Sequence, residues 1–430
     1  MQAKRLEINN FRGIRSLTID FHDRMNVFIG ENGAGKSAVL DLLAIMLSDF
    51  IRRLRPEKGT GRSYSKWDIT NGEARTLNRI SVDFEMGRTI WNSVKIKPGR
   101  LRTIQADFKA LNNVIRNYQY EFETQKDLDF PICIHYGVNR ALLDIPRRVR
   151  TKHSFASQLS AYDNALTSGT SDFRRFFEWF RNRQQQDGQI AVKLLESQDI
   201  EDPRREFAKY RDPQLDIVNK AIVSIMKRIR IARVQRSAPQ SMIVSKQGEE
   251  LSIDQLSDGE KCTLAMVGDL ARRLVIANPA RDDPLKGSGV VMIDEIDLHL
   301  HPAWQRMIVP GLRETFPNCQ FILTTHSPQV IGHIRSESVY ILRRFGLQTE
   351  ISHPEGSYGL DSNYILEAFM GGSVRNSEAE VALRTIFDEI DKGNLAEAKE
   401  RIAAFRRDIS DVPELAKAEV LIRSKRALAK

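Results

Sequence analysis

The run GENGAGKS at residues 30–37 carries the residue types that bind a phosphate chain. Closely spaced glycines let backbone N–H groups wrap around phosphates, a lysine can neutralise the β- and γ-phosphates, and a hydroxyl can bind Mg²⁺. This is the Walker A spacing. We therefore predict ATP and Mg²⁺ as cofactors, with Lys36 also acting in catalysis. The predicted contacts are Gly30, Glu31, Asn32, Gly33, Ala34, Gly35, Lys36 and Ser37.

A pair of carboxylates follows the apolar run GVVMI at residues 289–293. In phosphoryl transfer to water, one acid can hold the metal and another can orient or deprotonate the attacking water. We assign Asp294 to the Mg²⁺ shell together with Ser37, and Glu295 to the water. The sequence thus supplies a metal ligand and a catalytic base side by side.

Histidines near this pair are the remaining candidates for chemistry. His326 follows the run QFILTT at residues 320–325, which is predicted to be a buried strand, and it is the third functional element in chain order. We therefore predict that it contacts the γ-phosphate as a catalytic residue. His299 and His301 invite a metal interpretation, but no third ligand stands at a sensible spacing, so we do not assign them to a metal.

These groups need elements that bring them together. Strand-like runs within residues 4–29 lead into the glycine loop, and the helical pattern AVLDLLAIML follows it. The acidic pair and His326 each follow a buried strand, and ligands of open α/β sheets bind at the carboxyl ends of strands. A further polar run, LSDGEK at residues 256–261, opens another predicted helix. The sequence therefore predicts an α/β fold with one site at a sheet edge.

The set GENGAGKS, LSDGEK, VVMIDEIDLHLHP and TTHSP, in this order, resembles the ABC-type ATPases of the SMC, RecF and overcoming-lysogenization-defect branch. The resemblance implies Walker A, signature, Walker B with D-loop, and switch-histidine roles. It implies that the signature closes over ATP held by another protomer, giving a homodimer or higher homo-oligomer through ATP-sandwich heads. The residues carried over as nucleotide contacts in that interface are Ser257, Gly259, Glu260 and, in the D-loop, Asp297.

The resemblance also implies a glutamine loop between two lobes. Gln105, Gln119 and Gln125 all lie in a suitable part of the chain, and the sequence does not select among them. Part of the Mg²⁺ shell is therefore left open between these three residues.

The predicted fold class is α/β, a two-lobed ABC-type P-loop ATPase head with a helical insert and a C-terminal helical tail. The predicted segments are an N-terminal lobe with Walker A (1–145), the helical insert (146–238), a C-terminal lobe with signature, Walker B, D-loop and switch histidine (239–350), and the tail (351–430). The tail contains three helical patterns and is either a structural brace or a docking surface. It repeats the tetrapeptide DEID at 388–391 within a helical pattern that a Ser377–Glu380 capping box opens, so this copy is interpreted as a helix face.

An aromatic stripe marks the insert. Phe173, Phe176, Phe177 and Phe180 recur at helical spacing. Such a stripe is typical of a buried helix face, and a base-stacking platform is the alternative.

The segments YGVNRALLDIPRRVRTKHSF and DFRRFFEWF are similar to the ATPase subunit of Septu-type and retron-associated anti-phage systems, the PtuA-like proteins. This resemblance implies an anti-phage defence complex in which ATP-dependent head-to-head dimerisation regulates a separate effector, expected to be an HNH nuclease. Retron nucleic acid or phage DNA is a further expected partner.

Composition is consistent with nucleic acid as a partner and gives no reason to expect a membrane. The formal charge is +9 and the pI about 9.4, and basic clusters occur at 52–62, 147–152 and 227–236. Such clusters indicate either solvated surface or phosphate-backbone contact. Three scattered cysteines predict no disulfide or zinc framework, and no apolar run is long enough to span a bilayer, so we expect a cytoplasmic protein.

Two rival functions remain at this stage. A RecF- or SMC-like DNA-repair ATPase would act on DNA without an effector nuclease. A self-contained nuclease would need acidic residues at strand ends, but the carboxylates after residue 345 fall in predicted loops or helices. The chain is therefore expected to be an ATPase and not itself a nuclease.

Overall fold

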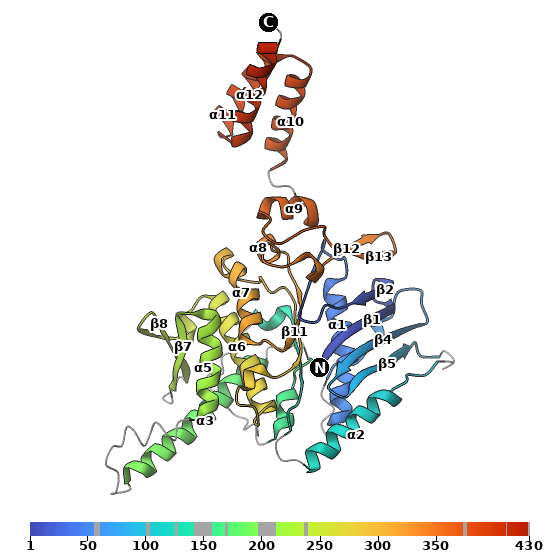
Figure 1. Cartoon of the computed structure of the whole chain (residues 1–430), viewed down its shortest axis with the longest axis vertical. Helices are drawn as coiled ribbons and strands as arrows, with labels where there is room; N and C mark the ends of the chain where they lie inside the picture. Colours follow the sequence, from blue (N-terminus) through green and yellow to red (C-terminus); the bar gives the residue numbers. More distant parts are fainter. Residues whose placement is uncertain are drawn as a thin grey trace. The chain divides into compact units, whose positions relative to one another are not determined.

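The computed structural model describes residues 1–55, 61–99, 104–124, 128–141, 157–167, 171–196, 212–235, 240–372, 376–409 and 411–428. The chain forms two compact units, Met1–Ser362 and Asn363–Lys430, both drawn in Figure 1. None of the helices within these described ranges is long and apolar enough to cross a membrane.

A six-stranded sheet forms the centre of the first unit, in the order β13-β12-β3-β11-β10-β6. Its strands are β3 (Met25–Ile29), β6 (Ile132–Tyr136), β10 (Gly289–Ile293), β11 (Cys319–Thr324), β12 (Val339–Phe345) and β13 (Gln348–Ser352). All neighbours are parallel except β12 and β13. Every residue of β3, β6, β10 and β11 is buried, as expected for parallel strands covered on both faces.

A four-stranded antiparallel sheet and two helices cover one side of this centre. The sheet has the order β2-β1-β4-β5, with β1 (Gln2–Phe11), β2 (Ile14–Asp20), β4 (Arg75–Phe84) and β5 (Gly87–Ile96). Helix α1 (Lys36–Leu54) contacts strands of both sheets, and α2 (Lys109–Thr124) packs on α1 and β5. Because α1 is enclosed in this way, its amino-terminal end is held at the edge of the central sheet.

The opposite side carries the second layer, as Figure 1 shows for α5, α6 and α7 relative to β11. This layer contains α3 (Ser171–Glu196), α5 (Pro213–Met226), α6 (Asp258–Ala277) and α7 (Pro302–Thr315). A small sheet of β7 (Ile229–Gln235), β8 (Ser241–Lys246) and β9 (Glu249–Ser252) adjoins it. Short helical turns are η2 (Lys66–Asp68), η3 (Val138–Ala141), η4 (Gln158–Tyr162), η5 (Ile253–Gln255), η6 (Pro284–Lys286), α8 (Pro328–Ile331) and η7 (Ser336–Ser338).

The mixed α/β fold class predicted from the sequence is confirmed by this arrangement. The segment boundaries stay a prediction. Strand β8 pairs with β7, so one sheet joins the residues on either side of position 238, and β13 runs through position 350. A boundary at either of these positions would therefore pass through a sheet.

The four phenylalanines of the aromatic stripe are buried in the core of the first unit. Phe173, Phe176, Phe177 and Phe180 on α3 are at most 3% exposed, so the base-stacking interpretation of these rings is wrong. The close approach of α3 to α6 explains one glycine, because a Cβ on Gly268 would lie only 2.5 Å from Phe176 Cζ.

A charged cluster is buried within the same layer. Asp269 accepts hydrogen bonds from Arg272 at 2.6 Å and from Arg273 at 2.7 Å, and all three side chains are essentially inaccessible. The hydroxyl of Tyr136, the last residue of β6, donates to Asp269 at 3.0 Å. Buried charges are tolerated only when paired and hydrogen-bonded. The cluster therefore ties α6 to the end of a central strand.

The second unit contains α9 (Ser362–Met370; its first residue belongs to the first unit), α10 (Ser377–Asp391), α11 (Leu395–Asp408) and α12 (Pro413–Leu428). Apolar residues of α10, α11 and α12 form one core, which confirms the three predicted helices and the helical setting of the second DEID. The predicted capping box is wrong by one residue. Asn376 caps α10 by accepting from Ala379 N at 2.8 Å, because the helix begins at Ser377 itself.

Phe176→Ala should lower the free energy of unfolding by about 3–5 kcal/mol, because it removes a ring from the contact between α3 and α6. Thermal and urea denaturation of the full chain measure this loss. Phe345→Ala is the matched control, since Phe345 is 58% exposed. Equal stability of the two variants would contradict the packing described here.

Candidate nucleotide-binding site

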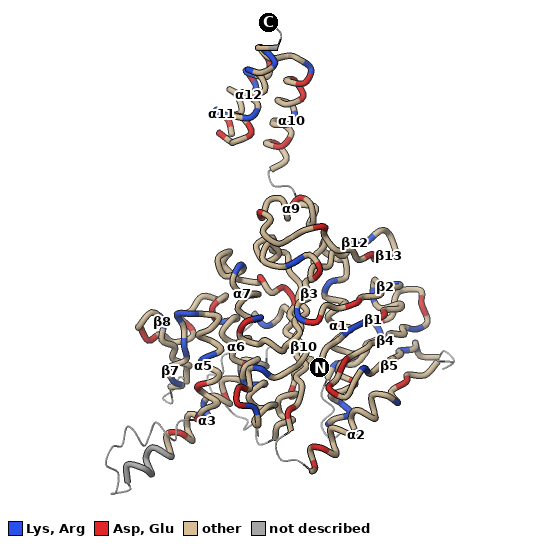
Figure 2. The backbone as a smooth tube through the Cα atoms, in the orientation of Figure 1, with Lys and Arg blue, Asp and Glu red and all other residues tan. Residues whose placement is uncertain are grey.

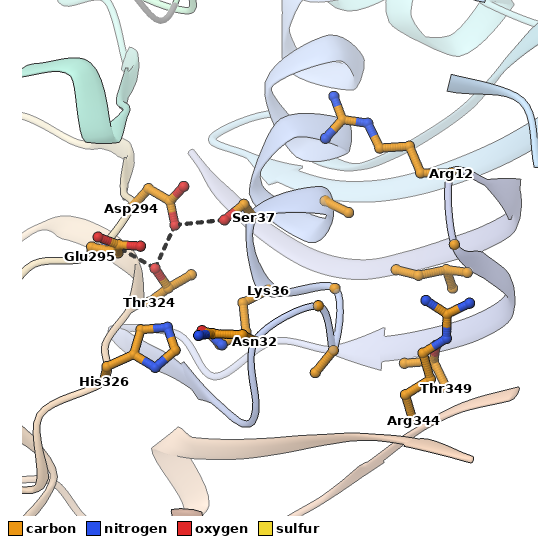
Figure 3. Close-up of a pocket in the computed structure, with 16 residues that line it drawn as sticks. Arg12, Asn32, Lys36, Ser37, Asp294, Glu295, Thr324, His326, Arg344 and Thr349 are labelled. Carbon is orange, nitrogen blue, oxygen red and sulfur yellow. Dashed lines mark hydrogen bonds between the residues drawn. The ribbon is translucent and has the colours of Figure 1, made fainter. Parts of the chain in front are cut away.

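A cavity of about 320 Å³ lies at the carboxyl edge of the central sheet (Figure 3). Residues 32–38 line its middle, and Asp294, Glu295, Thr324 and His326 line one end. The other end is formed by Arg12, Gly13, Ile14, Arg344 and Thr349. The structure thus brings together the predicted glycine loop, the acidic pair and the histidine from three separate parts of the chain.

The glycine loop has backbone angles that residues with a Cβ atom rarely adopt. Gly30, Gly33 and Gly35 have φ values of 144°, 82° and 109°, which favour glycine. At Gly30 a Cβ would also lie 2.2 Å from the carbonyl oxygen of Leu342. Gly35 precedes α1 directly, so the loop ends at a helix amino terminus, where N–H groups attract anions.

Lys36 is folded back against its own loop. Its Nζ donates to the carbonyl oxygens of Gly30 at 2.7 Å and Glu31 at 3.0 Å. Burial lowers the pKa of the Lys36 ammonium below its usual range, although the carboxylates of Asp294 and Glu295 oppose the shift. A phosphate chain in the cavity would favour the charged form in the same way, because an opposite charge stabilises the ammonium.

The two predicted metal ligands, Ser37 and Asp294, are hydrogen-bonded to each other. Asp294 Oδ1 accepts from Ser37 Oγ at 3.1 Å and from Thr324 Oγ1 at 2.5 Å. A carboxylate and a hydroxyl facing a cavity are hard oxygen donors of the kind that Mg²⁺ prefers when it also binds phosphates. The residues therefore fit Mg²⁺. Thr324 was not predicted, and its position at the end of β11, two residues before His326, was the available signal.

Glu295 has an unusual backbone that its neighbours hold in place. Its φ is 48°, and its N–H donates to Thr324 Oγ1 at 2.7 Å. The guanidinium of Arg140 donates to the carbonyl oxygens of both Asp294 and Glu295. Arg140, at the end of η3, is a positioning residue that sequence reasoning missed, although it lies within the YGVNRA run.

The backbone at His326 is held in place by Asp297, three residues after Asp294. Asp297 Oδ1 accepts from Thr325 Oγ1 at 2.6 Å and from the backbone N–H of His326 at 3.3 Å. Asp297 itself does not line the cavity. His301 caps α7, since its Nδ1 accepts from Ala303 N at 3.3 Å.

The signature residues lie at the start of α6, outside the cavity of their own chain. Ser257 and Glu260 form a capping box, and the Glu260 carboxylate also pairs with Lys246 at 2.8 Å. A Cβ on Gly259 would lie 2.3 Å from the carbonyl oxygen of His299, so the signature packs tightly on the chain after the D-loop. Their predicted nucleotide contacts stay predictions.

Among the described residues that line the cavity, none is a glutamine. Gln119 lies on α2, where its amide donates to the carbonyl of Arg53 at 3.4 Å, and Gln105 lies in the segment before α2. Gln125 lies outside the described residues. The choice among the three glutamines stays open. Arg140, in the turn after β6, donates to the backbone carbonyl oxygens of the acidic pair.

The basic clusters have different settings. In the first, Arg52 pairs with Asp49 at 2.6 Å, and Arg55 and Arg62 are paired with Asp163 and Asp41. In the third, Arg233 pairs with Glu250 at 2.5 Å. The cluster at 147–152 lies outside the described residues. Figure 2 shows basic residues interspersed with acidic ones over the described chain.

A glycine loop before a helix, an acidic pair after one strand and a histidine after the next define a P-loop nucleoside triphosphatase. Residues 25–332 match the family model described as "AAA domain, putative AbiEii toxin, Type IV TA system". Because the match spans more than half of the chain, this protein belongs to that ATPase family.

Two known relatives are a retron ATPase and a Septu protein. The chain is 30% identical over 409 residues to the retron Ec83 probable ATPase of Escherichia coli, covering 84% of this chain and 74% of that protein. It is 24% identical over 341 residues to the Septu protein PtuA of Bacillus thuringiensis, covering 76% and 72%. The predicted resemblance to retron and Septu ATPases is confirmed.

Solved structures of similar fold are more remote. The Smc head domain from Pyrococcus furiosus bound to the C-terminal domain of ScpA aligns with a TM-score of 0.48 and 13% identity. It covers 82% of this chain and 96% of that one.

Arg140→Ala should lower the ATP turnover number by about 10- to 100-fold, because small misplacements of catalytic groups are costly. The Kd for ATP should stay within about threefold, since Arg140 holds backbone carbonyls and not phosphates. Steady-state hydrolysis and calorimetric titration separate the two quantities. Arg233→Ala is the control, and unchanged turnover by Arg140→Ala would refute the positioning role.

Proposed function

We propose that this chain binds and hydrolyses ATP with Mg²⁺ as the ATPase subunit of an anti-phage defence complex. The observation that supports it best is the convergence of Ser37, Asp294, Glu295 and His326 on the cavity that the glycine loop lines. The relationship to retron and Septu ATPases supports the defence role.

In the proposed mechanism the loop N–H groups and Lys36 bind the phosphate chain. Ser37 and Asp294 would hold Mg²⁺, which neutralises charge that develops on the phosphates. Glu295 orients and deprotonates the attacking water. His326 contacts the γ-phosphate. Thr324 and Arg140 keep the two acids in place through their side-chain and backbone hydrogen bonds.

The site is proposed to be completed by a second copy of the chain. The signature and Asp297 do not line the cavity of their own chain, yet Ser257 is exposed at the amino terminus of α6, where the helix dipole favours an anion. A partner head placed face to face would bring this terminus to the γ-phosphate. ATP then stabilises the dimer, and hydrolysis releases it.

The effector is proposed to be a separate HNH nuclease whose activity depends on this ATP-driven dimer. The tail is proposed to supply a docking surface, because its three helices form a core of their own. Retron nucleic acid or phage DNA is the proposed trigger or cargo.

A RecF- or SMC-like repair ATPase is the alternative. It would need exposed cations for DNA, and several arginines of the first and third basic clusters are occupied in ion pairs. The two functions are separated by affinity purification from the native operon. A co-purifying nuclease supports the defence role, and ATP-dependent recovery of DNA without any protein partner supports repair.

Glu295→Gln should bind ATP but hydrolyse it at least about 100-fold more slowly, because the carboxylate that activates water is lost. The dimer should accumulate, as light scattering after size exclusion with ATP and Mg²⁺ would show. Lys36→Ala is the comparison and should lose ATP binding and remain monomeric. Equal hydrolysis rates for Glu295→Gln and the wild type would contradict the proposed role of Glu295 in activating water.

Ser257→Arg should leave ATP binding to one head unchanged but block ATP-driven assembly, because the bulky cation occupies the phosphate-facing terminus of α6. Sedimentation velocity with ATP measures assembly. Ser252→Arg is the matched control, since Ser252 caps another turn with the same capping-box geometry outside the signature. Assembly by Ser257→Arg at the wild-type concentration would refute the completion in trans.

A further inference from the structure

The end of the cavity away from Glu295 and His326 has no assigned role. It is bounded by the β1–β2 turn and by the β12–β13 hairpin, from which Arg344 and Thr349 reach the cavity (Figure 3). These two residues are directly opposite each other in the antiparallel register. Their side chains therefore lie on the same face of the hairpin.

Thr349 carries an unsatisfied hydrogen-bonding group. The residue is only 6% exposed, and its Oγ1 has no hydrogen-bond partner within the described chain. A buried hydroxyl without a partner is unfavourable and uncommon in folded proteins. Because Thr349 lines the cavity, a polar atom of a bound ligand can supply the missing partner.

Arg344 offers a flat cationic surface beside this hydroxyl. Its Nε donates to the carbonyl of Gly346 at 3.1 Å, which anchors the guanidinium to the hairpin turn. A Cβ on Gly13 would lie 3.1 Å from Arg344 Nη1, so the guanidinium lies close over the backbone of the β1–β2 turn. A planar guanidinium stacks well on aromatic rings.

The neighbouring cation is already committed to the fold. Arg12 Nη1 donates to Asp41 at 2.6 Å and its Nε donates to Asp68 at 2.9 Å. Arg12 therefore holds the β1–β2 turn on α1 and η2. Arg344 is left as the cation at this end whose terminal nitrogens are available to a ligand, among the residues that line the cavity.

We propose that Arg344 and Thr349 form the nucleobase end of the site, where the guanidinium stacks on a purine ring and the Thr349 hydroxyl bonds to its polar edge. The phosphates would lie over residues 33–37, between this end and the acidic pair. Figure 3 shows Lys36 between Arg344 and Thr349 on one side and Asp294 and Glu295 on the other. This inference rests on the proposed ATP binding and adds the element that recognises the base.

The test compares two ligands on the full chain. Calorimetric titrations with Mg²⁺ would use ATP and inorganic tripolyphosphate, which lacks base and sugar. Arg344→Ala and Thr349→Val should each weaken ATP binding about tenfold and leave tripolyphosphate binding unchanged. Thr349→Ser should restore ATP affinity, because it restores the hydroxyl.

Arg343→Ala is the matched control, since Arg343 is the neighbouring exposed residue of β12, opposite Glu350 in the register, and does not line the cavity. It should bind both ligands as the wild type does. Unchanged ATP affinity in Arg344→Ala and Thr349→Val, or an equal loss for both ligands, would overturn the proposal. Failure of the wild type to bind either ligand would instead overturn the proposed ATP-binding function and this inference with it.

Discussion

The parallel pairing of β3, β11 and β10 places the ends of three strands at one edge of one sheet. Phe28 is registered with Thr324, and Leu323 with Ile293. The glycine loop, the acidic pair and the histidine all follow these strand ends, so their side chains meet although they are far apart in sequence. Any shift of this register would separate Ser37 from Asp294, the pair proposed to hold Mg²⁺.

Hydrogen bonds at the sheet edge then convert proximity into defined geometry. Thr324 both donates to Asp294 and accepts from Glu295 N, which connects the end of β11 to the acidic pair after β10. Asp297 binds the residues around His326 in return. The groups proposed to be catalytic are therefore positioned by neighbouring loops that restrain each other. This arrangement suits chemistry that depends mainly on positioning and electrostatics.

The same network reaches the helix that carries the signature. The N–H of Asp294 donates to the carbonyl of Tyr136 at 2.9 Å, and the Tyr136 hydroxyl donates to Asp269 in the buried cluster on α6. A movement of α6 would therefore change the position of the acidic pair. These hydrogen bonds connect the acidic pair of the proposed nucleotide site to the helix of the proposed interface through buried groups.

The sequence by itself determined the glycine loop, the acidic pair and the histidine, because each depends on residue types at short spacing beside a strand or helix. It also determined the buried face of α3 and the three tail helices, because helical periodicity is local. Arg140, Thr324, Arg344 and Thr349 were decided only by the tertiary structure. Their roles depend on strand register and on contacts between distant segments, which local patterns do not encode. The glutamine that the resemblance implies stays unassigned among Gln105, Gln119 and Gln125, because its role would also depend on contacts between distant segments.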